Sequence, residues 1–143
     1  YATGKKQECV ALLEEMIELN PNDNQGVRDQ LLLYLIELNE FEKFKRYDKQ
    51  FDGDVGAFPL FYRALFAFKT EGETAASNKL FKRAIKHNVH VPAKLESAKP
   101  IKDFPDMYGF GDENEALYYA AFARHIWLHT VGAIGWLKER AKK

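Results

Sequence analysis

The sequence has little of three features that mark large classes of proteins: cysteine, long apolar runs and an excess of one charge. The single cysteine, Cys9, excludes an intrachain disulfide and is typical of a reducing compartment. No apolar run approaches the roughly 20 residues that span a bilayer. The 21 basic and 21 acidic residues balance, whereas binders of nucleic acid or anionic membranes carry a basic surplus. We therefore expect a cytoplasmic protein that binds neither nucleic acid nor membranes.

Hydrophobic residues, by contrast, make up 46% of the chain, and they recur in an internal repeat. Gly4, Asn39 and Gly72 align as equivalent loop residues, and Leu13 aligns with Phe81. Gly4 and Gly72 are separated by twice the period of about 34 residues that is typical of tetratricopeptide repeats. We therefore predict an all-α fold: a tetratricopeptide-like α-solenoid of about two and a half repeats, with a C-terminal loop and a capping helical hairpin.

Helical periodicity places the elements of this fold. Apolar residues recur with a period near 3.6 in five segments, which we predict as helices over residues 7–19, 27–38, 41–51, 58–70 and 74–88. Asn24 is the expected N-cap of the second segment. Residues 91–111 hold three prolines and two glycines without helical periodicity, which predicts an ordered crossing segment rather than a helix. Asp112 followed by Glu115 predicts the start of a helix over residues 113–129. Thr130 is the expected cap of a last helix that extends to about residue 142.

These elements predict two parts that pack as one unit: residues 1–90 with the repeats, and residues 91–143 with the crossing loop and the capping helices. Terminal repeats need a cap, because each repeat leaves an apolar face for its neighbour. We expect Tyr118, Tyr119, Trp127 and Trp136 to seal this open end. Tyr1 aligns near the end of the first helix of a repeat, so we also expect this sequence to be the last part of a longer chain.

Two stretches go beyond generic repeat features. Residues 19–28 read Leu-Asn-Pro-Asn-Asp-Asn-Gln-Gly-Val-Arg. Residues 104–119 read Phe-Pro-Asp-Met-Tyr-Gly-Phe-Gly-Asp-Glu-Asn-Glu-Ala-Leu-Tyr-Tyr, and residues 130–137, after Trp127, read Thr-Val-Gly-Ala-Ile-Gly-Trp-Leu. Over nearly its whole length the chain resembles bacterial tetratricopeptide-like proteins related to the suppressor-of-tumorigenicity-7 group. Val131 stands where that family usually has proline.

The resemblance implies a fold rather than a reaction: proteins of this group look like interaction proteins without an established activity. Some bacterial relatives carry a zinc-binding cysteine cluster beyond such a tail. With Cys9 as its single cysteine, this chain has no such cluster.

The predicted repeats place a partner-binding groove along their first helices, where tetratricopeptide arrays usually bind. The groove residues are Asp29, Leu33, Ile36, Glu37, Tyr62, Arg63, Phe66 and Lys69. An apolar floor with charges at the rim suits an amphipathic helix or an extended apolar peptide. We therefore predict a non-catalytic adaptor or scaffold for a protein or peptide. The alternative is a structural or dimerisation domain of a larger chain, whose groove is filled by its own C-terminal segment.

The histidines are the first candidates for metal chemistry. His125 and His129 are four residues apart on a predicted helix, and His87 and His90 form a second pair. A zinc site needs three or four ligands from neighbouring elements, and the sequence offers no cysteine pair or Glu-x-x-His pattern to complete one. We therefore expect packed histidines, no metal and no cofactor.

The carboxylates and the thiol give no stronger signal for catalysis. Asp112, Glu113 and Glu115 cluster in a predicted first helical turn, where carboxylates favour the helix dipole and the cap. Cys9 is expected at the small buried position of its repeat. We therefore predict that the chain is not an enzyme and has no catalytic residues.

Overall fold

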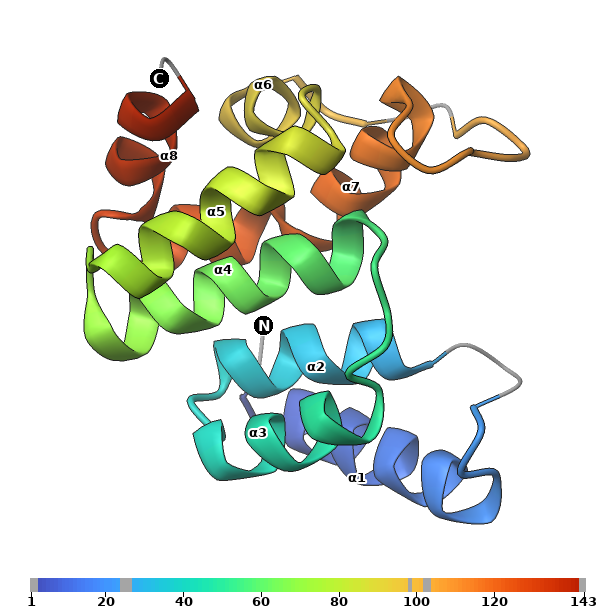
Figure 1. The fold of residues 1–143 in the computed structure, drawn as a ribbon. Helices are drawn as coiled ribbons and strands as arrows, with labels where there is room; N and C mark the ends of the chain where they lie inside the picture. The colour runs from blue at the N-terminus through green and yellow to red at the C-terminus, as the bar shows by residue number, and fades with distance from the viewer. Residues whose placement is uncertain (1–2, 24–26, 98, 102–103, 142–143) are drawn as a thin grey trace. The chain divides into compact units, whose positions relative to one another are not determined.

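The computed structural model describes residues 3–23, 27–97, 99–101 and 104–141, and it divides the chain into two compact units, Tyr1–Asp54 and Val55–Lys143 (Figure 1). Eight α-helices and no strand occur within these described residues, which confirms the all-α class. Of the helices described, none is long and apolar enough to cross a membrane.

The first unit contains α1 (Thr3–Leu19), α2 (Arg28–Glu37) and α3 (Phe41–Gln50), with α1 and α3 packed against α2. The carboxylate of Asp23 accepts hydrogen bonds from the backbone N–H groups of Val27 and Arg28, both at 2.9 Å, and so satisfies donors at the start of α2. The expected cap, Asn24, lies outside the described residues. Asn39 follows α2 at a φ of 61°, and Glu40 N–H returns to the carbonyl of Leu35, as in a Schellman motif.

The second unit begins with α4 (Ala57–Glu71) and α5 (Ala75–His87), which pack together as a helix pair. Gly72 ends α4 at a φ of 75°, a conformation that glycine adopts without steric cost. Thr74 and Ser77 then form a reciprocal capping box at the start of α5. Gly4, aligned with Gly72 in the repeat, lies instead inside α1. That expected loop position was wrong.

The remaining helices of the second unit are α6 (Val91–Glu96), α7 (Glu113–His129) and α8 (Ala133–Ala141). They pack against one another, and α7 and α8 also pack against α4. The C-terminal segment therefore packs with the third predicted repeat in the second unit, which begins at Val55. The predicted division into residues 1–90 and 91–143 stays a prediction.

Two details of this segment correct the sequence predictions. Residues 91–96 form α6, because Pro92 occupies the first turn, where the missing N–H of proline is tolerated. Val91 and Leu95 of α6 are fully buried, so packing also favours this short helix. Thr130 ends α7 rather than capping α8: its hydroxyl donates to the carbonyl of Ile126 at 2.8 Å, and α8 begins at Ala133.

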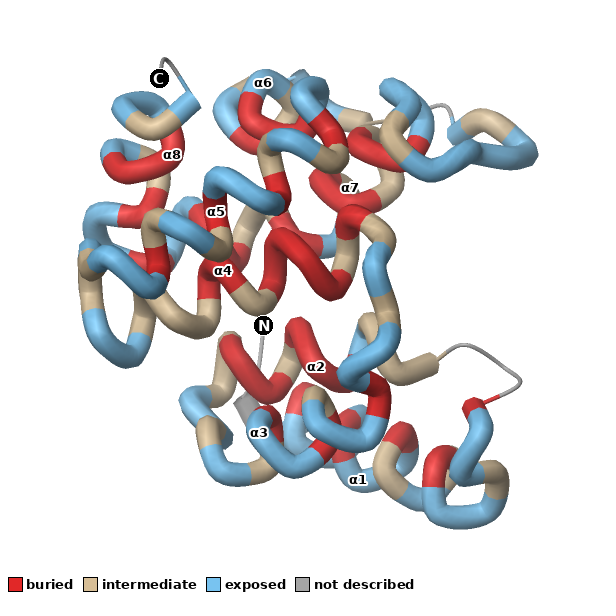
Figure 2. The backbone as a smooth tube through the Cα atoms, viewed as in Figure 1, coloured by how far each residue is buried: buried red, intermediate tan, exposed pale blue. Residues whose placement is uncertain are grey.

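An aromatic cluster forms the core of the second unit, in which α4 is buried along much of its length (Figure 2). Trp127 and Tyr119 are fully buried, and Trp136 is 4% exposed. The Phe81 ring contacts both tryptophans, with its centroid 5.8 Å from that of Trp127 and 4.5 Å from that of Trp136. Both tryptophans and Tyr119 are therefore buried packing residues, while Tyr118 is only partly buried. That the four residues seal the open end of a solenoid stays a prediction.

Candidate functional site

A buried hydrogen-bond network in the second unit is centred on the carboxylate of Glu115, which is 1% exposed. It accepts hydrogen bonds from the backbone N–H groups of Ala57 at 3.0 Å and Gly111 at 2.8 Å, and from the side-chain amide of Asn88 at 2.9 Å. The Nε2 atom of His87 lies 3.0 Å from Oε1. A buried carboxylate needs such partners, since an unpaired one is very costly to bury. Glu115 thereby joins α4, α5, α7 and the loop of residues 104–112 that lies before α7.

Asp112 caps α7 beside this cluster, as predicted. Its Oδ1 accepts the N–H of Glu115 at 2.8 Å, and its Oδ2 accepts the N–H of Gly109. The hydrogen bond from Glu115 N–H, followed by that from Gly109 N–H, lowers the pKa of the Asp112 carboxyl, because both stabilise the charged form. Glu113 is exposed and pairs with Lys94 at 3.0 Å, which lowers its pKa as well.

The lowered pKa of Asp112 predicts an acid-dependent contribution to stability. A carboxyl whose pKa is lower in the folded than in the unfolded chain stabilises the fold fully at pH values above its unfolded pKa of about 4. This stabilisation is lost as the pH falls through the lowered pKa of the folded state. Asparagine also caps helices, so Asp112→Asn removes mainly the charge. In urea titrations, we expect the stability difference between the parent and Asp112→Asn to be present at neutral pH and to shrink in acid. A difference independent of pH would contradict this assignment.

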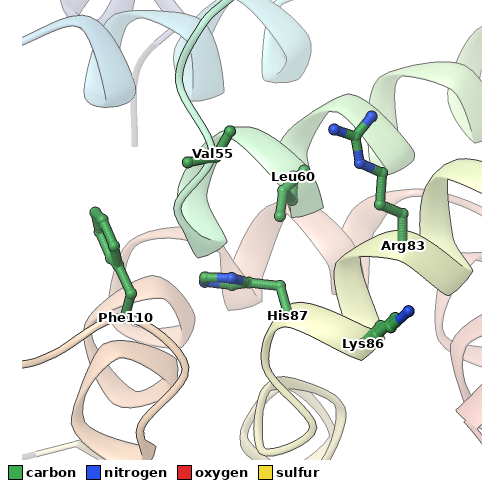
Figure 3. Close-up of a pocket in the computed structure, with 6 residues that line it drawn as sticks. All are labelled: Val55, Leu60, Arg83, Lys86, His87 and Phe110. Carbon is green, nitrogen blue, oxygen red and sulfur yellow. The ribbon is translucent and has the colours of Figure 1, made fainter.

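Beside the Glu115 cluster, the second unit has a pocket of about 470 Å³, lined by Val55, Leu60, Arg83, Lys86, His87 and Phe110 (Figure 3). Its lining comes from the segment before α4, from α4 and α5, and from the loop before α7. Pockets that bind small ligands or side chains have volumes of this order. The pocket combines apolar walls with basic side chains.

The loop before α7 carries exposed apolar side chains in a fixed conformation. Met107 is 81% exposed and Phe110 is 74% exposed. Tyr118 of α7 holds the loop from one side, because its ring packs on Tyr108 at 5.1 Å and its hydroxyl donates to the carbonyl of Pro105. Gly111 holds the other end through its N–H bond to Glu115. Met107 and Phe110 are therefore exposed on a loop that contacts with Tyr118 and Glu115 hold against the rest of the unit.

Two glycines allow the Phe110 loop to approach neighbouring segments closely. A Cβ at Gly56 would lie 3.3 Å from the Phe110 ring and 3.5 Å from Glu115 Oε2, so glycine permits this approach. Gly111 has a φ of 86°, and a Cβ there would lie 3.1 Å from the carbonyl oxygen of His87. The two glycines thus let the loop lie against the ends of α4 and α5, with the Phe110 ring at the pocket.

The predicted groove residues are divided between the two units: Asp29, Leu33, Ile36 and Glu37 lie on or within α2, and Tyr62, Arg63, Phe66 and Lys69 lie on α4. Leu33, Ile36 and Tyr62 are buried, and the other five are partly exposed. An open groove would leave Leu33, Tyr62 and Phe66 partly exposed. Of these three side chains, Phe66 is partly exposed and the other two are buried. A common groove formed by the eight residues stays a prediction.

The histidines and the cysteine occupy separate surroundings. His87 faces Glu115, and Nδ1 of His129 lies 2.7 Å from the carbonyl of His125. Within the part of the chain that the structure describes, no three His, Cys, Asp or Glu side chains are grouped as a metal site. Cys9 is exposed, so its expected burial was wrong.

Sequence reasoning missed the pocket, although one signal for it was present. The segment that forms α5 carries Lys79, Lys82, Arg83 and Lys86 but no acidic residue, in a chain whose basic and acidic residues balance overall. The proximity of Phe110 to this helix could not be read from the sequence, because it depends on long-range hydrogen bonds to Glu115.

Comparison with known proteins identifies no relative of this chain: no family model, no curated protein and no solved structure matches it.

Proposed function

We propose that this chain is a non-catalytic protein–protein interaction module that binds its partner at the surface around Phe110. The observation that carries the proposal is the 74% exposure of the Phe110 side chain in a loop fixed by hydrogen bonds. Exposed apolar groups at the rim of a pocket are typical of interaction sites. Their fixed conformation reduces the entropy lost on binding.

The tetratricopeptide-like arrangement belongs to the same proposal. Two consecutive helix pairs, α2–α3 and α4–α5, support it, because the first helix of each pair ends at a left-handed residue, Asn39 and Gly72. Repeat proteins of this type act mostly as binding scaffolds. The burial of Leu33 and Tyr62 favours the Phe110 surface over the groove predicted from the sequence.

A capture experiment with matched variants tests the proposal. Met107→Ser/Phe110→Ser removes two exposed apolar side chains of the loop, and Val131→Ser removes one from the turn between α7 and α8, where Val131 is 96% exposed. We expect crosslinking pull-downs from lysate of the source cell to capture the same protein with the parent chain and Val131→Ser. The double variant, with unchanged helicity by circular dichroism, should lose it. Equal capture by all three chains would refute this surface.

A structural or dimerisation domain is the second candidate, and the burial of Leu33 and Tyr62 favours it. Sedimentation velocity separates the two functions. A stable dimer of the parent chain that dissociates in Met107→Ser/Phe110→Ser would support dimerisation through the loop. A monomer that still captures a protein would support the interaction module.

A further inference from the structure

We infer that the pocket at Phe110 binds an acidic segment of a partner protein, one that inserts a single apolar side chain between flanking carboxylates. The inference rests on the proposed function and names the chemistry of the partner. It is based on the positive charge and the apolar walls of the pocket.

The charge of the pocket is the first argument. Lys86 and His87 follow Arg83 by three and four residues, which places both of them beside Arg83 on the surface of α5. Arg83 and Lys86 are exposed, and neither forms an ion pair with any residue that the structure describes. Helix α5 as a whole carries four lysine or arginine residues and no carboxylate. Two free cations on an acid-free helix complement a partner with negative charge.

Glu115 does not pair with Arg83 or Lys86 at the pocket. Its side chain is 1% exposed and lies behind His87, and both of its oxygens already accept hydrogen bonds from the protein. The carboxylate therefore orients His87 and the loop, while Arg83 and Lys86 remain available to an incoming anion.

The apolar walls are the second argument. Val55 and Phe110 are 54% and 74% exposed, and Leu60 lines the pocket between them and α5 (Figure 3). The Phe110 ring meets the His87 ring edge to face, with centroids 6.1 Å apart. A volume of about 470 Å³ accommodates one large side chain with its backbone. A purely ionic ligand would leave these apolar walls in water, whereas an apolar anchor buries them.

An extended peptide fits this combination better than a lipid surface does. The cations lie on one helix beside a concave pocket. A peptide can place one apolar side chain into the pocket while the acidic residues that flank it in the peptide reach Arg83 and Lys86. Membrane-binding surfaces instead carry a broad basic excess, and this chain has a formal net charge of zero. An acidic peptide segment is therefore the expected occupant of the pocket.

Selection from a phage library of short random peptides tests this inference with the full chain. Arg83→Glu/Lys86→Glu reverses the pocket cations, and Lys79→Glu/Lys82→Glu makes the same charge change elsewhere on α5. We expect peptides enriched on the parent to carry several Asp or Glu residues beside one large apolar residue. In fluorescence anisotropy these peptides should bind the control variant like the parent, and bind the pocket variant at least about tenfold more weakly, a loss of about 1.4 kcal/mol. Circular dichroism must show that both variants keep their helices.

Four results would overturn the inference. They are no enrichment, enrichment of peptides without acidic residues, equal weakening by the two charge reversals, and binding to phosphatidylserine vesicles without binding to acidic peptides. The proposed function is tested separately. If capture from lysate depends on Met107 and Phe110 while the selected peptides are neutral, the interaction module stands and the acidic partner is excluded. If capture does not depend on these residues, the proposed function itself fails.

Discussion

Replacing Glu115 with glutamine is expected to lower the free energy of unfolding by about 3–5 kcal/mol, the usual cost of breaking a buried charged network. The two side chains are nearly isosteric, so no cavity forms. Oε1 faces Asn88 Nδ2 and Gly111 N, and Oε2 faces Ala57 N. Whichever way the new amide is oriented, its NH2 group therefore meets an N–H donor. Each buried donor left without an acceptor adds its own desolvation cost.

Urea denaturation followed by tryptophan fluorescence is the measurement, because both tryptophans lie in the second unit and report on its unfolding. Glu113→Gln is the matched control in the same helical turn. The Glu113 side chain is 65% exposed and pairs with Lys94 at the surface, where water screens the interaction, so we expect a far smaller change than for Glu115→Gln. Similar losses for the two variants would show that the hydrogen bonds of Glu115 do not contribute to stability.

The same substitution also connects stability to function. Gly111 N–H donates to Glu115, and Gly111 follows Phe110 directly. Loss of that bond should release the Phe110 loop and weaken binding at the proposed surface, even under conditions where the second unit remains folded. Under the proposed function, Glu115 would position Phe110 without itself contacting the partner.

The helices that the sequence predicted well have strong local signals. The helix of residues 113–129 was predicted with the bounds that α7 has, because Asp112 caps it and apolar residues recur along it. Helices α2, α3, α4 and α5 were predicted to within one or two residues at each end. Local patterns determine such elements, since capping and periodicity act within one or two turns.

The rest could not be predicted, because it depends on contacts between distant segments. Glu115 has the sequence signature of a capping-box residue, yet its carboxylate binds groups contributed by Ala57, His87 and Asn88. Helix α6 lies in a proline-containing stretch, and the burial of Val91 and Leu95 is what favours it. The pocket combines residues from three segments, so its apolar and basic sides were recognisable only after the loop was placed on α5.

Replacing Trp127 with alanine should have the other large effect, a loss of about 3–5 kcal/mol in the free energy of unfolding of the second unit. The side chain is fully buried, and its ring stacks on Trp136 with centroids 6.3 Å apart. Its indole N–H also donates to the Tyr119 hydroxyl at 2.9 Å, so the variant creates a cavity and leaves a buried hydroxyl without this donor. Small domains are stable by about 5–15 kcal/mol, so this loss is a large share of the total. Circular dichroism during urea denaturation measures it independently of the missing fluorophore.

Two further variants separate the causes of that loss. Leu128→Ala removes the next side chain of α7, which is 57% exposed, and should change stability by less than about 1 kcal/mol. Tyr119→Phe keeps the ring and removes the hydroxyl, so it should cost about 1 kcal/mol, the usual net contribution of one hydrogen bond. In a double-mutant cycle, Tyr119→Phe should cost less in the Trp127→Ala background, because the hydrogen bond is already absent there. Equal stability of Trp127→Ala and Leu128→Ala would contradict the aromatic cluster as the core of this unit.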